Sequence, residues 1–419
     1  MSTSITNRGV AYRLSVMMFL QYASLGSWSV TLGTYIKSNT GSAGLGIFDG
    51  DFIGWLLLAQ SLGALFAPFG FGVLADRYVS TEKLLAGLHT AAAGCLCLMA
   101  TSRESGWFFL SALIYFQVYS PTGALSSSLA LRQLPGGQQY FAVVRSLGTV
   151  GWIAAGVVVG VGWRTVSGES IEAAATPMWL AVACHLAMAG YSLTLPHTPP
   201  LGKMSGGWRA LAGGGRLWRN RSFVILIVLS ALVMAPAQFY NGLVHPFLNQ
   251  HGFQDAASLL TLGQLGEVIV MITLPWLLLR FRLKTLFLCG ASMWVIRFGL
   301  FAMCDGEAPA VLIYPAILVH GFAFVYVYLT GQLYIDRLAD PDARAAAQGV
   351  HAVAVFGVGN MIGALATGVA EARYLTPAGL EPPPYNWPDF WALACLLSLL
   401  PAVLFAVLFR EQKVGKKEA

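Results

Sequence analysis

The sequence predicts an all-α polytopic membrane protein, and three observations lead to this class. Of the 419 residues, 56% are hydrophobic and only 11% are charged, whereas soluble domains carry about 25% charged residues. Apolar runs of about 20 residues, long enough to cross a hydrocarbon core about 30 Å thick, recur along the whole chain. Short polar segments separate these runs. The composition therefore excludes an ordinary soluble enzyme, and the runs are too long for a transmembrane β-barrel.

The breaks between apolar runs predict twelve membrane-spanning helices. We expect them at residues 12–36, 51–75, 83–101, 107–131, 140–163, 176–195, 222–248, 257–279, 284–303, 309–335, 345–372 and 387–409. The first run is long and lacks a small-residue cleavage site, so we expect it to remain as a span and not to be removed as a signal peptide.

Lysine and arginine residues lie mostly on one side of the predicted spans. Nineteen of the 25 lie there; the exceptions are Lys37, Arg103, Arg164 and Arg373 on the other side, and Arg145 and Arg297 inside apolar runs. The positive-inside rule then predicts a multi-pass plasma-membrane protein with both termini in the cytoplasm. Basic loops facing anionic membrane lipids account for the net charge of +6, so no nucleic-acid partner is needed.

One connection, residues 196–221, is longer than the others and rich in Pro, Gly and Arg. It divides the chain into an N-terminal half, 1–195, and a C-terminal half, 222–419, each with six predicted helices. Two related six-helix halves are typical of secondary transporters. We expect the protein to act as a monomer.

Metal and nucleotide sites are not indicated. The six cysteines fall in or beside apolar runs without paired metal-type spacing, and the seven histidines form no helical metal-binding pair. Glycine-rich stretches such as 156–160 lack the following Lys-Ser/Thr of a phosphate loop, so close helix packing explains them better. We therefore expect no metal, no cofactor and no ATPase module.

Polar residues inside the spans recur at helical spacing. The pattern selects Gln21 in the first span, Arg145, Thr149 and Trp152 in the fifth, Gln238 and Asn241 in the seventh, and Gln264 and Glu267 in the eighth. A charge near the bilayer centre costs at least about 2.5–3.5 kcal/mol, so Arg145 and Glu267 must face protein or water. They form either a structural ion pair or part of a polar substrate site between the halves.

The residue types suit a nucleoside. Amides such as Gln238, Asn241 and Gln264 offer a donor and an acceptor together and match the edge of a base, while Trp152 and Phe324 can stack on its face. Arg145 and Glu267 can serve hydroxyls of the ribose. A sugar or another small polar solute is the alternative, because amides and aromatic rings also suit hydroxyl-rich rings.

The segment Gly72-Val73-Leu74-Ala75-Asp76-Arg77-Tyr78, with Lys83 after it, resembles the cytoplasmic signature of the major facilitator superfamily. An Asp at a helix end that faces cations and a neighbouring helix N-terminus can latch two halves together. The glycine would permit close packing. We therefore assign Asp76 and Arg77 to gating.

Six further patches, in order along the chain, resemble the nucleoside:proton symporter family, which includes the bacterial nucleoside permeases. They are Phe19–Tyr22 with Gly26–Trp28 and Thr31–Gly33, Tyr119–Thr122, Arg145–Thr149, Leu193–His197, Trp294–Phe298 and Ala345–Gly349. The resemblance implies alternating-access transport of uridine, adenosine or similar nucleosides in a bacterial inner membrane. It also implies that Arg145, Thr149, Trp152, Gln238, Asn241, Gln264, Glu267 and Phe324 line the site; Gln21 is added from the polar stripe alone.

The sequence departs from the family at one position. Family members carry an acid after the Ala-Phe pair of the tenth span and use it in proton coupling, whereas here Val325 follows Ala323-Phe324. Valine cannot bind a proton. Two alternatives remain open: Glu267 carries the proton, or the protein is a facilitator.

Overall fold

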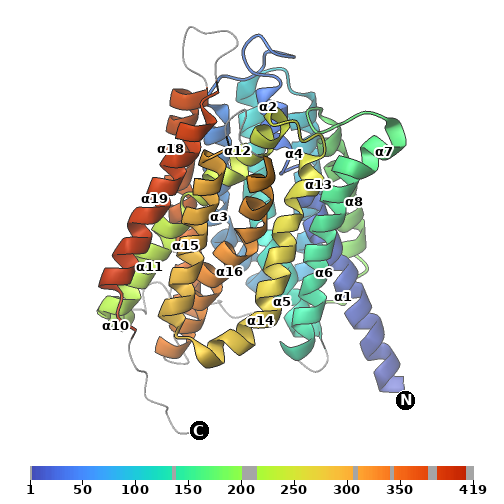
Figure 1. The fold of residues 1–419 in the computed structure, drawn as a ribbon. Helices are drawn as coiled ribbons and strands as arrows, with labels where there is room; N and C mark the ends of the chain where they lie inside the picture. Colours follow the sequence, from blue (N-terminus) through green and yellow to red (C-terminus); the bar gives the residue numbers. More distant parts are fainter. Residues whose placement is uncertain are drawn as a thin grey trace. The chain divides into compact units, whose positions relative to one another are not determined.

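The computed structural model describes residues 2–134, 138–200, 215–304, 310–339, 344–375 and 385–411. Across these ranges the regular structure is helical, and the single β-type contact is an isolated bridge between Thr40 and Phe48. Figure 1 shows the helices in order along the chain. The all-α fold class predicted from the sequence is confirmed.

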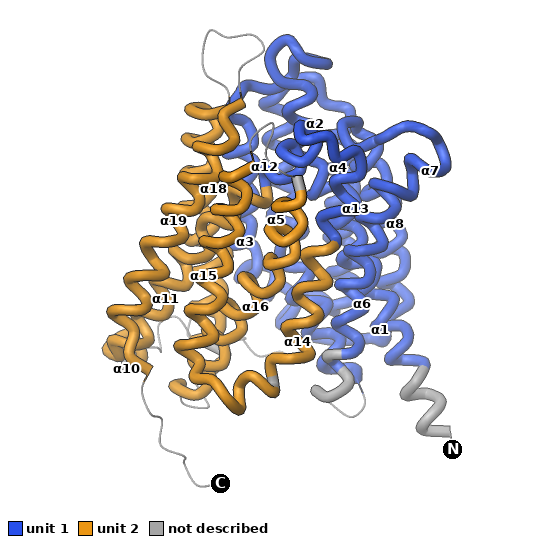
Figure 2. The backbone as a smooth tube through the Cα atoms, in the orientation of Figure 1, with its two compact units in different colours: residues 1–205, 242–261 blue, residues 206–241, 262–419 orange. Residues whose placement is uncertain are grey.

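The chain packs as two compact units, coloured separately in Figure 2. One contains residues 1–205 and 242–261, and the other contains residues 206–241 and 262–419. Segment 242–261 therefore packs with the first unit although it comes later in the sequence than the predicted linker. The division into 1–195, 196–221 and 222–419 stays a prediction, and residues 201–214 of that linker lie outside the described residues.

The helices of the first unit begin at the N-terminus and end with a short helix after residue 255. They are α1 (Ser2–Gly26), α2 (Leu32–Lys37), α3 (Phe52–Arg77), α4 (Thr81–Thr101), α5 (Ser105–Gln133), α6 (Gln138–Val157), the π-helix η1 (Val158–Gly162), α7 (Trp163–Ser167), α8 (Thr176–Ser192) and α13 (Ala256–Leu260). Helix α12 (Ala237–Gln250) begins in the second unit and ends in the first.

The second unit contains the remaining helices. They are α10 (Gly215–Trp218), α11 (Arg221–Met234), α14 (Leu262–Arg280), α15 (Leu283–Ala302), the 3-10 helix η2 (Ala310–Leu312), α16 (Ile313–Leu338), α17 (Arg344–Ala352), the π-helix η4 (Val353–Gly359), α18 (Asn360–Ala370), the π-helix η5 (Glu371–Leu375) and α19 (Trp387–Leu408).

Ten helical segments of the described part are long and apolar enough to cross a membrane. They correspond to ten of the twelve predicted spans. The other two predicted spans are also helical. Residues 12–36 contain the C-terminal part of α1 and nearly all of α2. Residues 176–195 contain α8, which has 17 residues. The described helices are thus consistent with twelve spans.

Several predicted spans are interrupted, which the apolar runs did not reveal. Residues 27–31 form turns between α1 and α2, where the hydroxyls of Ser27 and Thr31 donate to the carbonyls of Ala23 and Trp28. Such local hydrogen bonds compete with a regular helix. The seventh predicted span breaks between α11 and α12 at Ala235 and Pro236, because proline has no N–H to donate.

Glycines permit close helix contacts inside each unit. In the first unit, a Cβ on Gly151 of α6 would collide with the backbone of Phe19 of α1, and one on Gly26 would lie 3.2 Å from Trp152. In the second unit, a Cβ on Gly359 would lie 2.6 Å from the carbonyl oxygen of Ala231. By contrast, a Cβ on Gly72 would meet nothing within 4 Å. The expectation that Gly72 serves close packing is therefore wrong in this structure.

A buried polar cluster holds segment 242–261 within the first unit. The Thr34 hydroxyl lies 2.6 Å from Nδ1 of His245, and Nε2 of that ring lies 3.5 Å from Oε2 of Glu172. The other carboxylate oxygen of Glu172 accepts the N–H of Ala257 at 2.8 Å. These groups connect α2, the segment between α7 and α8, α12 and the first turn of α13.

Candidate functional site

Three predicted site residues, Arg145, Thr149 and Trp152, lie on α6 and are half-buried. Their spacing of four and three residues puts them on one face of the helix. The guanidinium of Arg145 lies 4.2 Å from the centroid of the Tyr22 ring on α1, a cation–π contact. Tyr22, which the sequence argument included only as part of a family patch, is therefore the residue that supports Arg145.

Gln21 is fully buried, with both ends of its amide engaged within the first unit. Its Nε2 donates to the Thr122 hydroxyl at 2.7 Å, and its Oε1 lies 3.0 Å from Nε2 of His89. The Thr122 hydroxyl in turn donates its single proton to the carbonyl of Tyr119 at 2.6 Å. Thr122 must therefore accept from Gln21, and the carbonyl of Gln21 must accept from His89.

The donor and acceptor roles of these hydrogen bonds also determine the roles in the next ones, which involve two buried histidines. Because His89 donates through Nε2, its Nδ1 accepts from Nδ1 of His185 at 2.9 Å. Nε2 of His185 then accepts from the Tyr115 hydroxyl at 3.1 Å, and that hydroxyl accepts from the indole of Trp28 at 3.3 Å. Every hydrogen bond is satisfied with both rings neutral. The network positions Gln21 and engages both ends of its amide within the first unit.

The second unit carries the remaining predicted site residues. Gln238 and Asn241 both lie on α12, but Gln238 is 0% exposed whereas Asn241 is exposed. Among the described residues, neither amide atom of Gln238 has a hydrogen-bond partner. A buried amide without partners costs about 1–3 kcal/mol, so this group is poised to accept a polar ligand or water.

Gln264 and Glu267 lie on one face of α14, and both are half-buried. Glycines bring this face against α16: a Cβ on Gly263 would lie 3.2 Å from Cβ of His320, and one on Gly321 would collide with the backbone of Glu267. The close contact between α14 and α16 therefore brings the backbone of α14 at Gly263 against His320 and the backbone at Glu267 against Gly321.

Phe324 is half-buried and belongs to a row of rings along α16. His320, Phe324 and Tyr328 follow at intervals of four residues, with centroid distances of 6.4 and 5.8 Å and interplanar angles of 19° and 26°. Other rings also pack on this row: Tyr240 stacks on His320, and His351 stacks on Tyr328. The row is therefore part of a larger aromatic cluster, in which the half-buried Phe324 can present a ring to a planar base.

Val325 points to a different environment from Phe324. It is 3% exposed and belongs to an apolar cluster with Val270, Leu274, Leu286 and Tyr326. The position where the resemblance led us to expect an acid is thus apolar in its surroundings as well as in its own side chain.

Arg297, which the sequence placed inside an apolar run, forms the centre of a cluster that the site prediction missed. It is 0% exposed, its guanidinium lies 3.3 Å from the centroid of the Tyr240 ring, and its Nη1 lies 2.7 Å from Nδ1 of His320. A buried arginine in a span is expensive. This cost marks Arg297 as a candidate functional residue in the sequence, but the sequence could not show which rings surround the charge.

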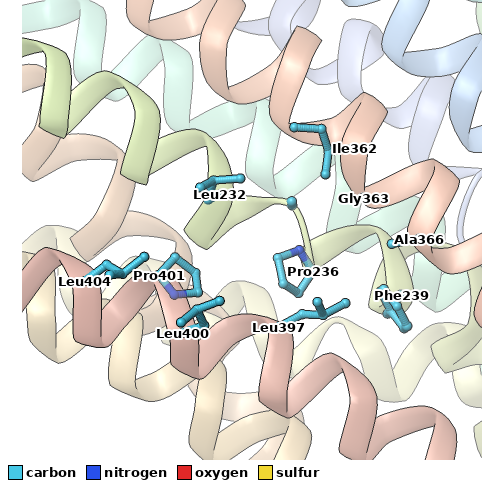
Figure 3. Close-up of a pocket in the computed structure, with 11 residues that line it drawn as sticks. Leu232, Pro236, Phe239, Ile362, Gly363, Ala366, Leu397, Leu400, Pro401 and Leu404 are labelled. Carbon is cyan, nitrogen blue, oxygen red and sulfur yellow. The ribbon is translucent and has the colours of Figure 1, made fainter.

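A cavity of about 150 Å³ lies in the second unit beside the break at Pro236, as Figure 3 shows. Its lining consists of Leu232, Ala235, Pro236, Phe239, Ile362, Gly363, Ala366, Leu397, Leu400, Pro401 and Leu404. These side chains offer no hydrogen-bonding group to a polar solute. The cavity is therefore unsuited to a nucleoside.

The residues assigned to gating lie at the end of α3, where Asp76 is half-buried and Arg77 is exposed. In the part of the chain that the structure describes, no group of three or more His, Cys, Asp or Glu residues is arranged to hold a metal ion.

Membrane-length helices in two units, with polar side chains inside the spans, define a polytopic membrane protein with the features expected of a secondary transporter. Residues 8–414 match the family model described as Nucleoside H+ symporter. The chain belongs to the nucleoside H+ symporter family.

Relatives and solved structures agree with this assignment. YegT of Escherichia coli (strain K12) is 30% identical over 409 residues, covering 95% of this chain and 93% of that protein. Xanthosine permease of the same organism is 29% identical, covering 94% and 95% of the two chains. A crystal structure of a point mutant of the nucleoside transporter NupG has a TM-score of 0.85 at 27% identity, covering 96% of this chain and all of that one.

The fold extends beyond the family. A crystal structure of a D-xylose–proton symporter has a TM-score of 0.73 at 14% identity, covering 97% of this chain and 99% of that one. At this identity the likeness concerns the fold alone. It agrees with the major facilitator fold expected from the segment around Asp76.

Proposed function

We propose that this chain carries nucleosides such as uridine or adenosine across the membrane by alternating access. The observation that carries the proposal is the match to the nucleoside H+ symporter family over residues 8–414. The side chains support it: Arg145, Thr149 and Trp152 in one unit, and Gln238, Asn241, Gln264, Glu267 and Phe324 in the other, provide amides, charges and ring faces. We assign these eight residues to the nucleoside site.

Gln21 enters this proposal in a changed role. Both ends of its amide are engaged by Thr122 and His89, so we propose that it supports the first unit's part of the site. Asp76 and Arg77 remain our candidates for gating. We also propose that the protein works as a monomer among the lipids of a bacterial inner membrane, with both termini in the cytoplasm.

For energy coupling we propose proton symport through Glu267. Family membership supports symport, and Glu267 is a half-buried carboxylate in the second turn of α14. The second candidate is a facilitator, which the apolar surroundings of Val325 favour. A transporter without a titrating group in its cavity would carry nucleosides only down their gradient.

Proton movement distinguishes the two candidates. Adding uridine to proteoliposomes should make the medium more alkaline as protons enter with the nucleoside, and Glu267→Gln should abolish this change. Asp336→Asn, which alters an exposed acid near the end of α16, is the matched control and should behave as wild type. Uridine uptake without proton movement would establish the facilitator instead.

A further inference from the structure

The apolar cavity beside Pro236 opens on the outer surface of membrane-length helices. Its lining residues Ile362, Leu397 and Leu400 have exposed side chains, and all three lie inside such helices. Figure 3 shows side chains of α11, α18 and α19 converging on this space. Leu400 lies well inside α19 (Trp387–Leu408), where an exposed side chain contacts the hydrocarbon of the bilayer. The cavity is therefore open to lipid.

The lining of the cavity selects an apolar occupant. Its volume is about 150 Å³, and its side chains are aliphatic, prolyl or aromatic. An apolar cavity holds water poorly, because a buried water molecule needs several polar partners. Lining atoms that face an unfilled space lose dispersion contacts. An acyl chain of the surrounding bilayer can restore these contacts, because it is apolar, narrow and flexible.

A basic surface lies at one end of the same helices. Arg219 precedes α11, Arg221 begins it, and Arg410 follows α19; all three side chains are exposed. The Ser222 hydroxyl donates to the carbonyl of Arg410 at 2.9 Å, which joins these helix ends (Figure 1). Within the described part of the chain, the three guanidiniums make no hydrogen bond or ion pair. We call these three residues the arginine cluster.

The acid next to this cluster does not neutralise it. Oε2 of Glu411 accepts the backbone N–H of Lys284 at 3.2 Å. The ammonium of Lys284 donates to the carbonyls of Ala406 and Phe409 at 2.8 and 2.7 Å and offsets the carboxylate charge. The arginine cluster therefore presents a positive surface suited to an anion.

The distance between the cavity and the arginine cluster matches the depth of one lipid leaflet. Leu404 of the cavity lies six residues before Arg410, and Leu232 lies eleven residues after Arg221. At about 1.5 Å per helical residue, these separations are about 9 and 16 Å. The hydrocarbon of one leaflet is about 15 Å deep, half of the core. Trp218, beside the cluster, is 44% exposed, as is common for tryptophans at a membrane interface.

We propose that the second unit binds an anionic phospholipid, with its phosphate on the arginine cluster and one acyl chain in the cavity beside Pro236. Guanidinium groups bind phosphate through paired, charge-assisted hydrogen bonds, so the cluster selects an anionic headgroup. The acyl chain fills the space at the break between α11 and α12, so the lipid stabilises this part of the second unit. The proposal does not depend on nucleoside transport.

Native mass spectrometry of the purified full-length protein tests the headgroup contact. The probes are phosphatidylglycerol and phosphatidylcholine with identical acyl chains. Wild type should bind the first phosphatidylglycerol about tenfold more tightly than phosphatidylcholine. The double variant Arg221→Gln/Arg410→Gln should lose most of this preference. The matched control Arg103→Gln/Arg373→Gln, which changes two exposed arginines elsewhere, should keep it. No preference in wild type, or an unchanged preference in Arg221→Gln/Arg410→Gln, would overturn the proposal.

A cavity-filling variant tests the acyl-chain contact. Ala366→Leu places a larger side chain in the cavity, so phosphatidylglycerol should bind about tenfold more weakly. Ala406→Leu, at an exposed position of α19 outside the cavity, is the control and should bind as wild type does. Wild-type affinity in Ala366→Leu would contradict occupation of the cavity.

Melting temperatures of the wild-type protein provide a test that needs no variant. Phosphatidylglycerol should raise the melting temperature, because it fills the cavity of the folded protein. Glycerophosphoglycerol, which has the same headgroup without acyl chains, should leave the melting temperature unchanged. An equal rise with both compounds would show that the arginine cluster binds phosphate without an acyl chain in the cavity, and would overturn the proposed lipid site.

Discussion

Two glutamines selected for the same site, Gln21 and Gln264, differ in what their amides contact. Both are polar residues in apolar helices, which is all that the sequence shows. The Gln21 amide is engaged at both ends, by Thr122 and His89, whereas the Gln264 amide forms no hydrogen bond within the described part of the chain. Helical spacing can place a side chain on a face, but the partners come from other helices. The sequence therefore selects both residues as site candidates but cannot distinguish their roles in the site.

The amides of Gln264 and Asn241 give a direct prediction at this scale. Gln264→Ala and Asn241→Ala should each weaken uridine binding by about 1–3 kcal/mol, because polar atoms of the bound nucleoside would lose their partners. Calorimetry on the purified protein measures the change. Gln250→Ala, at the exposed end of α12, is the control and should leave affinity unchanged. Wild-type affinity in both site variants would remove these residues from the site.

At the scale of helices, the sequence predicted positions well and interruptions poorly. The predicted span 83–101 corresponds to α4 (Thr81–Thr101), and 284–303 corresponds to α15 (Leu283–Ala302), because apolar length decides where a span lies. The break at Pro236 and the π-helices η1 and η4 were not predicted, since neighbouring helices can compensate for lost backbone hydrogen bonds inside a membrane.

The contact between α14 and α16 gives the prediction for this scale. Gly321→Ala places a methyl group against the backbone of Glu267. Overpacking of this kind costs about 1–3 kcal/mol and should move α14, with Gln264 and Glu267, away from α16. We expect a lower melting temperature together with weaker uridine binding.

Gly299→Ala on α15 is the matched control for that substitution. A Cβ there would lie 3.8 Å from Sγ of Cys395, an ordinary contact. It should leave binding intact and change stability by no more than about 1 kcal/mol in the favourable direction. Equal behaviour of the two alanine variants would show that the contact at Gly321 does not position the site.

For the whole molecule, the placement of segment 242–261 has the largest consequence. The segment packs in the first unit while the chain on both sides of it belongs to the second. If the two units part during transport, the contacts of Thr34, Glu172 and His245 must break or the chain must bend at the ends of the segment. Hydropathy predicts the number of spans, but it could not assign segment 242–261 to the first unit. That assignment depends on polar contacts between residues far apart in the sequence.

Removing the carboxylate of Glu172 should loosen this segment. Glu172→Ala leaves the N–H of Ala257 without its acceptor, and a lost buried hydrogen bond costs about 1–3 kcal/mol. Amide hydrogen exchange over residues 256–260 should therefore become roughly tenfold faster. Glu169→Ala, at an exposed acid three residues earlier, is the control. Unchanged exchange in Glu172→Ala would show that the cluster does not hold the segment.

The most direct test of nucleoside transport is uptake of radiolabelled uridine and adenosine into proteoliposomes that contain the purified protein. We predict saturable uptake that excess unlabelled nucleoside abolishes and that excess D-xylose leaves unchanged. Empty liposomes and the Gln264→Ala variant provide the comparison. Uptake no greater than in empty liposomes, or inhibition by the sugar equal to that by nucleoside, would contradict the account.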